Sequence, residues 1–181
     1  MLKAATIVLS IACSTSFFWA IKFFFAQKTG TPTGMKLLGL VGALFTLLHL
    51  ATLFFHPSQM QWALWTGLAL YILSLALFWW TIQTNRKRPL TLAYSGDHPE
   101  HLVMEGPYAW VRHPFYTAYT IAWIAGVVAT SYPPLLVTVG VMVAMYVHAA
   151  RLEERKFAET ALASEYAAYT RRTGRFFPRL L

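Results

Sequence analysis

The sequence predicts an all-α, polytopic integral membrane protein with five transmembrane helices and a cytoplasmic C-terminal helix. Of its 181 residues, 57% are hydrophobic and only 12% are charged, whereas a soluble domain is about a quarter charged. Five apolar segments are long enough to cross a bilayer, which takes about 20 residues, with roughly 17 to 25 tolerated. The length suits a single membrane domain covering residues 1–181.

The five predicted spans follow one another closely, except for one long polar interruption. They are residues 4–25, 37–55, 62–82, 114–131 and 134–150. The first has the short basic start of a signal peptide, but its apolar stretch is too long for one, so we expect a retained span. Proline is favoured in the first turn of a helix, so the fourth span begins at Pro114. Only Tyr132 and Pro133 separate the fourth and fifth spans, which must therefore form an antiparallel hairpin.

The charged residues predict the orientation. If the C-terminal tail is cytoplasmic, residues 83–113 and 151–181 are cytoplasmic too and the N-terminus is outside. All 15 lysines and arginines except Lys3 then lie inside, together with all seven carboxylates. We expect a protein of the bacterial inner membrane that contacts membrane lipids and acts at its cytoplasmic surface. The net charge of +8 therefore indicates topology rather than nucleic-acid binding, and the pattern specifies no oligomeric state.

Small residues predict how the hairpin packs. Ala118, Ala122, Gly126 and Thr130 recur every four residues in the fourth span, and Gly140 and Ala144 do so in the fifth. Close packing along these stripes would bring residues 112–116 next to residues 148–154.

Helical geometry then sorts the end of the fifth span, at 100° per residue. With Gly140 at zero, Arg151 falls at about 20° and Glu154 at about −40°, both on the expected packing face. Glu153 falls at about 220°, turned away. Glu154 is thus expected in a pocket and Glu153 in solvent.

The junction "GPYAWVRHPFY", residues 106–116, carries side chains suited to a ligand. The free amides at the helix start and the charge of Arg112 would favour an anion. Tyr108, Trp110 and Tyr116 could hold a planar ring or a cation, or could serve as interface anchors. The pair Glu153-Glu154 is either a second half of the site or a solvated face with intrahelical ion pairs. S-adenosylmethionine, with its carboxylate, ammonium, sulfonium and adenine, has the charges and the ring to match both segments.

Other polar residues carry weaker signals. His49 and His148 lie in or near spans, and His148 is close enough to the expected pocket to be a candidate. His98 and His101 lie near Asp97 and Glu100 without the spacing of a metal motif, so no metal site is predicted. The single cysteine excludes a disulfide framework.

Together, "HLVMEGPYAWVRHPFY", the hairpin, "EE" and "EYAAYTRRTGRFFP" resemble the isoprenylcysteine carboxyl methyltransferase family, whose wider group includes membrane phospholipid N-methyltransferases. The resemblance covers about residues 98–178. It implies an integral membrane enzyme that moves a methyl group from S-adenosylmethionine to a lipidic or small hydrophobic acceptor, most like a prenylcysteine carboxylate. The acceptor's tail would enter from the bilayer.

The resemblance also implies site residues. The cofactor contacts would be Glu100 or His101, Leu102, Val103, Tyr108, Arg112, His113, Pro114, Phe115, Tyr116, Glu153 and Glu154. Glu100 stands where the family has a histidine, with His101 one residue later. Arg151 lies one residue after the position of the family's substrate-binding arginine, which is Ala150 here.

Three alternatives remain open on the sequence. A carboxylate or thiolate acceptor needs no general base, whereas an amine, including that of a phospholipid, must lose a proton to Glu154 or His148. A sterol-type reductase that uses NADPH is a different enzyme class with a similar C-terminal region. A membrane subunit or small transporter would have no catalytic site.

Overall fold

The computed structural model describes residues 1–25, 30–56, 60–88 and 90–179, and within these residues its regular elements are all helices, with no strand. Its helices are α1 (Leu2–Trp19), which continues into the π-helical turn Ala20–Phe24, then α2 (Thr33–Phe55), α3 (Gln61–Thr84), α4 (Pro114–Thr130), α5 (Leu136–Ala158) and α6 (Ala163–Arg172). Short 3₁₀ turns at Gly106–Ala109 and Pro133–Leu135 precede α4 and α5.

Four of these helices are long and apolar enough to cross a membrane, so the chain is an integral membrane protein. They are Leu2–Phe24, Thr33–Phe55, Gln61–Thr84 and Pro133–Ala158. The predicted fourth span forms α4, which is shorter at 17 residues. Large apolar side chains such as Leu44, Leu47 and Trp62 point outward from the bundle, as expected for a lipid-facing surface.

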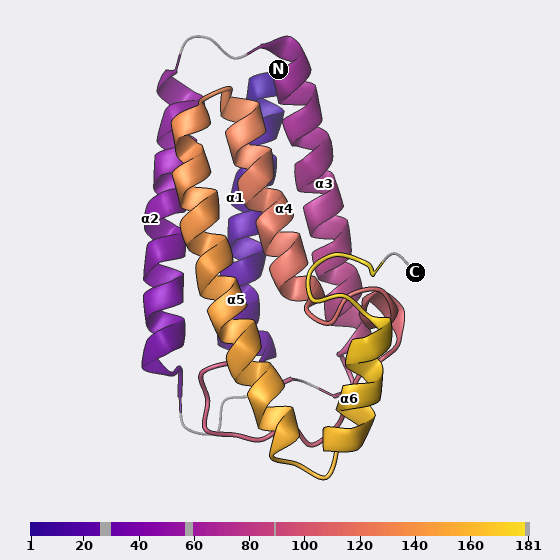
Figure 1. Ribbon diagram of the computed structural model, residues 1–181. Coiled ribbons are helices and arrows are strands. Elements are labelled where there is room, and N and C mark those ends of the chain that lie inside the picture. The colour runs from indigo at the N-terminus through magenta and orange to yellow at the C-terminus, as the bar shows by residue number, and fades with distance from the viewer. Residues whose placement is uncertain (26–29, 57–59, 89, 180–181) are drawn as a thin grey trace.

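Figure 1 shows α1 to α5 as an upright bundle, with α6 and the long α3–α4 connection gathered at one end. We call this the charged end of the bundle. Helix α1 packs against α2, α3 and α4. Because α4 and α5 form the predicted hairpin, the start of α4 and the end of α5 both reach the charged end (Figure 1).

Close helix packing occurs between α3 and α4. A Cβ atom added to Gly67 would lie 2.6 Å from the Cβ of Ala129, so only glycine permits this approach. The hydroxyl of Ser74 donates to the backbone oxygen of Ala118 at 2.7 Å. The small residues of α4 therefore pack, but chiefly against α3.

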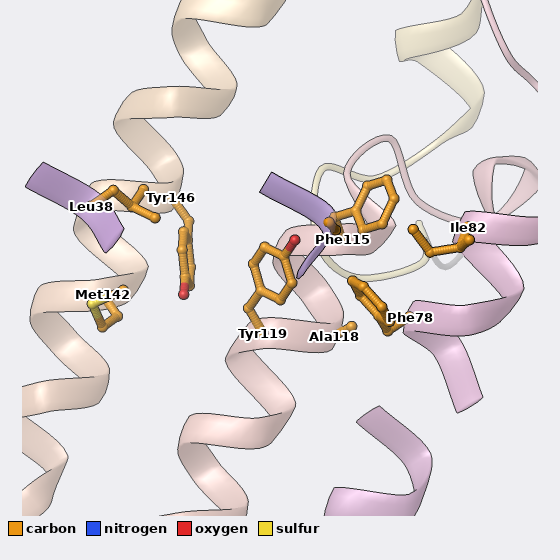
Figure 2. Close-up of a cluster of buried hydrophobic side chains, with 9 residues drawn as sticks. Leu38, Phe78, Ile82, Phe115, Ala118, Tyr119, Met142 and Tyr146 are labelled. Carbon is orange, nitrogen blue, oxygen red and sulfur yellow. The ribbon is translucent and has the colours of Figure 1, made fainter. Parts of the chain in front are cut away.

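The prediction that α5 packs through Gly140 and Ala144 is wrong. Both residues are exposed, and a Cβ on Gly140 would meet no atom within 4 Å. The buried face of α5 carries larger side chains instead, notably Met142 and Tyr146. Figure 2 shows Tyr146 beside Tyr119 of α4, with ring centroids 5.6 Å apart. Aromatic side chains therefore fill the interface between α4 and α5, and the two backbones do not approach closely through small residues.

Candidate functional site

The C-terminal tail returns to the start of α4 and pairs with it. Val111 and Gly174 form a parallel bridge. The backbone amide of Arg112 donates to the oxygen of Gly174 at 2.8 Å, and that of His113 to the oxygen of Arg175 at 3.1 Å. We call residues 173–177 the strap, because these bonds hold the tail across the entrance of α4.

Glu154 is the centre of an ion-pair network beneath the strap. Its Oε1 accepts from Arg112 Nη2 and His113 Nε2, each at 3.2 Å, and from Arg175 Nε at 3.0 Å. Its Oε2 accepts from Arg175 Nη2 at 2.6 Å. The two arginines and His113 thus surround one carboxylate that is 16% exposed. Arg112 also donates to the oxygen of Thr173, which ties the network to the strap.

Glu153 is also held in the site, so the prediction that it faces solvent is wrong. The hydroxyl of Tyr116 donates to its Oε1 at 2.7 Å, and its Oε2 lies 3.2 Å from His113 Nδ1. The prediction failed because Gly140, the reference for the angles, lies on the exposed face of α5. Counted from the buried Tyr146 and Ala149, Glu153 continues the inward face at helical spacing.

His113 lies between the two carboxylates, with one ring nitrogen 3.2 Å from each. Burial lowers the pKa of His113, but its hydrogen bonds and the charges of Glu153 and Glu154 outweigh burial and raise it above the ordinary value. Both nitrogens can donate only in the protonated ring. The geometry therefore favours an imidazolium.

We expect the stability that His113 contributes to fall as pH rises. Because its pKa is raised on folding, the contribution is complete below about pH 6.5 and is lost as pH passes the raised value. The melting temperatures of wild type and His113→Gln should be compared from about pH 5 to about pH 9. The wild-type advantage should be largest at the acidic end, and a difference that does not vary with pH would contradict the assignment.

A cavity of about 230 Å³ opens beside this network, and we call it the site cavity. Eleven predicted cofactor residues line it: Glu100, His101, Leu102, Val103, Tyr108, Arg112, His113, Pro114, Phe115, Tyr116 and Glu153. Glu154, the twelfth, is not among the lining residues and lies behind Arg112 and His113 in the network. The structure thus gathers two segments, separated by about forty residues of sequence, around one space.

Two of the residues predicted to be catalytic do not reach this cavity. Arg151 and His148 are exposed, and neither is among the lining residues. The ring of His148 lies 6.0 Å from that of Tyr94, on the outer side of α5. Of the predicted catalytic residues, only Glu154 belongs to the site, as a member of the network.

Other residues of the cavity wall were missed by the sequence analysis. Lys156 donates to the backbone oxygens of Ser95 at 2.5 Å and Leu92 at 3.4 Å, which fixes the α3–α4 connection over the cavity. Tyr166 and Tyr169 of α6 also line it. The spacing of three residues places both tyrosines on one helix face, a signal present in "EYAAY" that could have identified them.

Tyr108 is fixed from two sides. Its hydroxyl accepts from Asn85 Nδ2 at 3.0 Å, and its backbone oxygen accepts from the hydroxyl of Tyr169 at 2.6 Å. Burial is the main cause of a pKa of Tyr169 raised to about 12, so this phenol remains a donor at neutral pH. These bonds join α3, the turn before α4 and α6 into one wall.

Comparisons with known proteins identify the family of the chain. Residues 62–164 match the profile of a family described as phospholipid methyltransferase. The cobalt-zinc-cadmium resistance protein CzcN of Cupriavidus metallidurans is 31% identical over 134 residues, which cover 72% of this chain and 59% of that protein. The chain therefore spans about three-fifths of the length of this curated relative. The family match contains α3, α4 and α5 but ends before the strap.

Proposed function

The chain belongs to the phospholipid methyltransferase family, a group related to the isoprenylcysteine carboxyl methyltransferases, and we propose that it transfers a methyl group from S-adenosylmethionine to a hydrophobic acceptor. The observation that carries this proposal is the site cavity, where a carboxylate, a cationic histidine and several tyrosines converge at the end of a membrane bundle.

The lining of the site cavity fits this donor. Glu153 lines it with a carboxylate that suits a cationic ligand, and Tyr108 and Tyr166 line it with aromatic rings. His101 also lines the cavity, and its Nε2 is buried with no hydrogen-bond partner among the described residues. When bound, S-adenosylmethionine would supply a methyl group on a cationic sulfur. Once the methyl group is transferred, the rest of the molecule leaves as a neutral thioether.

For the acceptor, the contacts favour an amine over a prenylcysteine carboxylate. A carboxylate acceptor would need a cation to hold it, yet Arg112 and Lys156 already donate to protein oxygens. Arg151, one residue after the family's clamp position, is exposed and outside the lining. An amine instead loses a proton when it gains a methyl group, and a carboxylate can accept that proton. We assign this role to Glu153, in place of Glu154 or His148.

The first test is calorimetric binding of S-adenosylmethionine to the purified protein. We expect wild type to bind and Glu153→Gln to bind about 10-fold more weakly, since a hydrogen bond to a charged group is lost. Glu159→Gln is the matched control, because this carboxylate is 67% exposed at the end of the same helix. If wild type binds NADPH and not S-adenosylmethionine, the reductase alternative replaces this proposal.

The acceptor class has its own test. A lipid extract incubated with the protein and methyl-labelled S-adenosylmethionine should yield a labelled product that is heavier by one CH₂ group. We expect the label on nitrogen. Label on a base-labile methyl ester would instead show a carboxylate acceptor.

A further inference from the structure

Six basic side chains at the charged end are exposed and do not line the site cavity, and we call them the basic rim. Three follow the end of α3, two end α6 and one lies in the tail: Arg86, Lys87, Arg88, Arg171, Arg172 and Arg179. Within the described part of the chain, none of the six forms an ion pair with a carboxylate. The site and the proposed function therefore leave these charges unexplained.

Hydrogen bonds bring the two halves of the basic rim to one place. Asn85, just after α3, donates to the hydroxyl of Tyr108 at 3.0 Å, and the backbone oxygen of Tyr108 accepts from Tyr169 of α6. In the other half, Arg179 Nη1 donates to the backbone oxygen of Arg171 at 2.8 Å. Figure 1 shows α6 and the C-terminal tail beside the end of α3.

Few carboxylates oppose this charge. Glu105 is exposed before the turn Gly106–Ala109, and Glu165 is exposed in the first turn of α6. The other carboxylates lie at the site or beside the end of α5: Asp97, Glu100, Glu153, Glu154 and Glu159. The surface formed by α6, the tail and the end of α3 is therefore positive.

Tryptophans on α3 indicate where the membrane ends. Trp62 and Trp79 are both exposed, and the helix rises about 26 Å between them. Tryptophan is enriched at both faces of a bilayer, whose hydrocarbon core is about 30 Å thick. Helix α3 continues past Trp79 to Thr84, so the basic side chains that follow it lie in the headgroup layer.

The strap lies at the same level as the basic rim. A Cβ atom on Gly106 would lie 2.5 Å from the hydroxyl oxygen of Thr84, so the turn before α4 rests on the last residue of α3. The strap pairs with residues 111–113, which follow this turn. Trp110 and Phe177 flank the pairing in sequence and are 63% and 72% exposed. Large aromatic rings exposed in this layer are typical of side chains that contact lipid headgroups.

We infer that the basic rim and the strap form a docking surface for anionic phospholipid headgroups of the leaflet at the charged end. Lipid phosphates would pair with the exposed guanidinium and ammonium groups, and Trp110 and Phe177 would enter the interface beside them. A zwitterionic lipid also carries a cation, so it gains less from a surface of one sign.

A headgroup bound at this surface would act on the site through the strap. The strap accepts the backbone amides of Arg112 and His113, and Arg175 donates to Glu154. A lipid phosphate that bridges the two halves of the basic rim would hold the tail against the turn before α4. On the proposed function, an anionic membrane should therefore strengthen the binding of S-adenosylmethionine.

The first test measures lipid binding without any methyl donor. The detergent-solubilised full chain is titrated with phosphatidylglycerol or with phosphatidylcholine of the same acyl chains, and native mass spectrometry resolves each bound lipid. We expect the Kd of the first phosphatidylglycerol to be at least about 5-fold lower, the gain from one basic side chain near an anionic surface. Equal Kd values for the two lipids would overturn the inference.

A matched pair of variants locates the lipid. Lys87→Gln/Arg172→Gln removes one exposed charge from each half of the basic rim, and Arg151→Gln/Arg155→Gln removes two exposed charges from α5. The first variant should weaken phosphatidylglycerol binding by at least about 5-fold, whereas the second should leave it nearly unchanged. Equal weakening in both would mean that the whole charged end attracts the lipid, and would refute the assigned surface.

The second test follows the strap. In nanodiscs of phosphatidylcholine, added phosphatidylglycerol should slow hydrogen exchange of the Arg112 and His113 amides, which donate to the strap. The slowing should persist in the α5 variant and vanish in the rim variant. Exchange that does not respond to the lipid in wild type would refute the coupling between headgroup and strap.

Donor affinity completes the test. Phosphatidylglycerol should lower the Kd of S-adenosylmethionine by about 5-fold in wild type, the lower end of typical coupling between two sites. The rim variant should lose this gain, and a gain that it retains would count against the docking surface. Failure of wild type to bind S-adenosylmethionine in either membrane would refute the proposed function instead, because lipid binding and amide exchange are measured without the donor.

Discussion

Glu154→Gln should lower the free energy of unfolding by about 3 kcal/mol, the lower end of the range for removing one partner of a buried ion pair. The substitution keeps the shape of the side chain but removes the charge that Arg112, Arg175 and His113 share. Three cationic groups would then face one another in a partly buried place. Thermal or denaturant unfolding in detergent, followed by circular dichroism, measures the loss.

Glu153→Gln is the informative comparison. This variant leaves the contacts of Glu154 with Arg112 and Arg175 in place, so we expect its stability loss to be the smaller of the two. Glu153→Gln should mainly weaken the binding of S-adenosylmethionine, because Glu153 lines the site cavity and Glu154 does not. Equal stability losses in both variants would show that the division of roles between these neighbours is wrong.

Hydropathy was sufficient to predict the helices. All five predicted spans form helices with nearly the predicted bounds, because a run of apolar residues in lipid has few alternatives to a helix. The exception is the end of α5, which continues to Ala158 rather than stopping at residue 150. The hydropathy pattern ends where the charges begin, but residues 151–158 are good helix formers.

The residues around the site cavity were predicted where they lie in one local motif and missed where tertiary contacts bring them there. The junction before α4 lies in one motif, and its residues line the site cavity. Arg175 was not predicted, since no periodicity shows that the strap returns to pair with Val111 and to reach Glu154. Glu153 and Arg151 were assigned to the wrong sides of α5 because small residues were taken as the packing surface, whereas Tyr146 fills the interface.

Gly174→Ala should disrupt the site from outside the cavity. A Cβ atom at this position would collide with the backbone oxygen of Phe177, and its three nearest neighbours are all backbone atoms, which cannot rotate away. The strap would have to shift, and the hydrogen bonds from Arg112 and His113 to its backbone would break. We expect a lower melting temperature and binding of S-adenosylmethionine weakened by at least about 10-fold, a loss of about 1.4 kcal/mol.

The control for Gly174→Ala is Gly96→Ala, since a Cβ there meets no atom within 4 Å. The strap contacts the site in two ways, through its backbone hydrogen bonds to Arg112 and His113 and through the Arg175 side chain. Arg175→Ala tests these separately, because it removes the bond to Glu154 and leaves the backbone hydrogen bonds in place. If the strap acts mainly through Arg175, both strap variants should weaken binding to the same extent. If Gly174→Ala binds normally while Arg175→Ala does not, the backbone pairing is dispensable and the guanidinium alone orders the network. Normal binding in both would mean that Arg112 and His113 hold Glu154 without help from the tail.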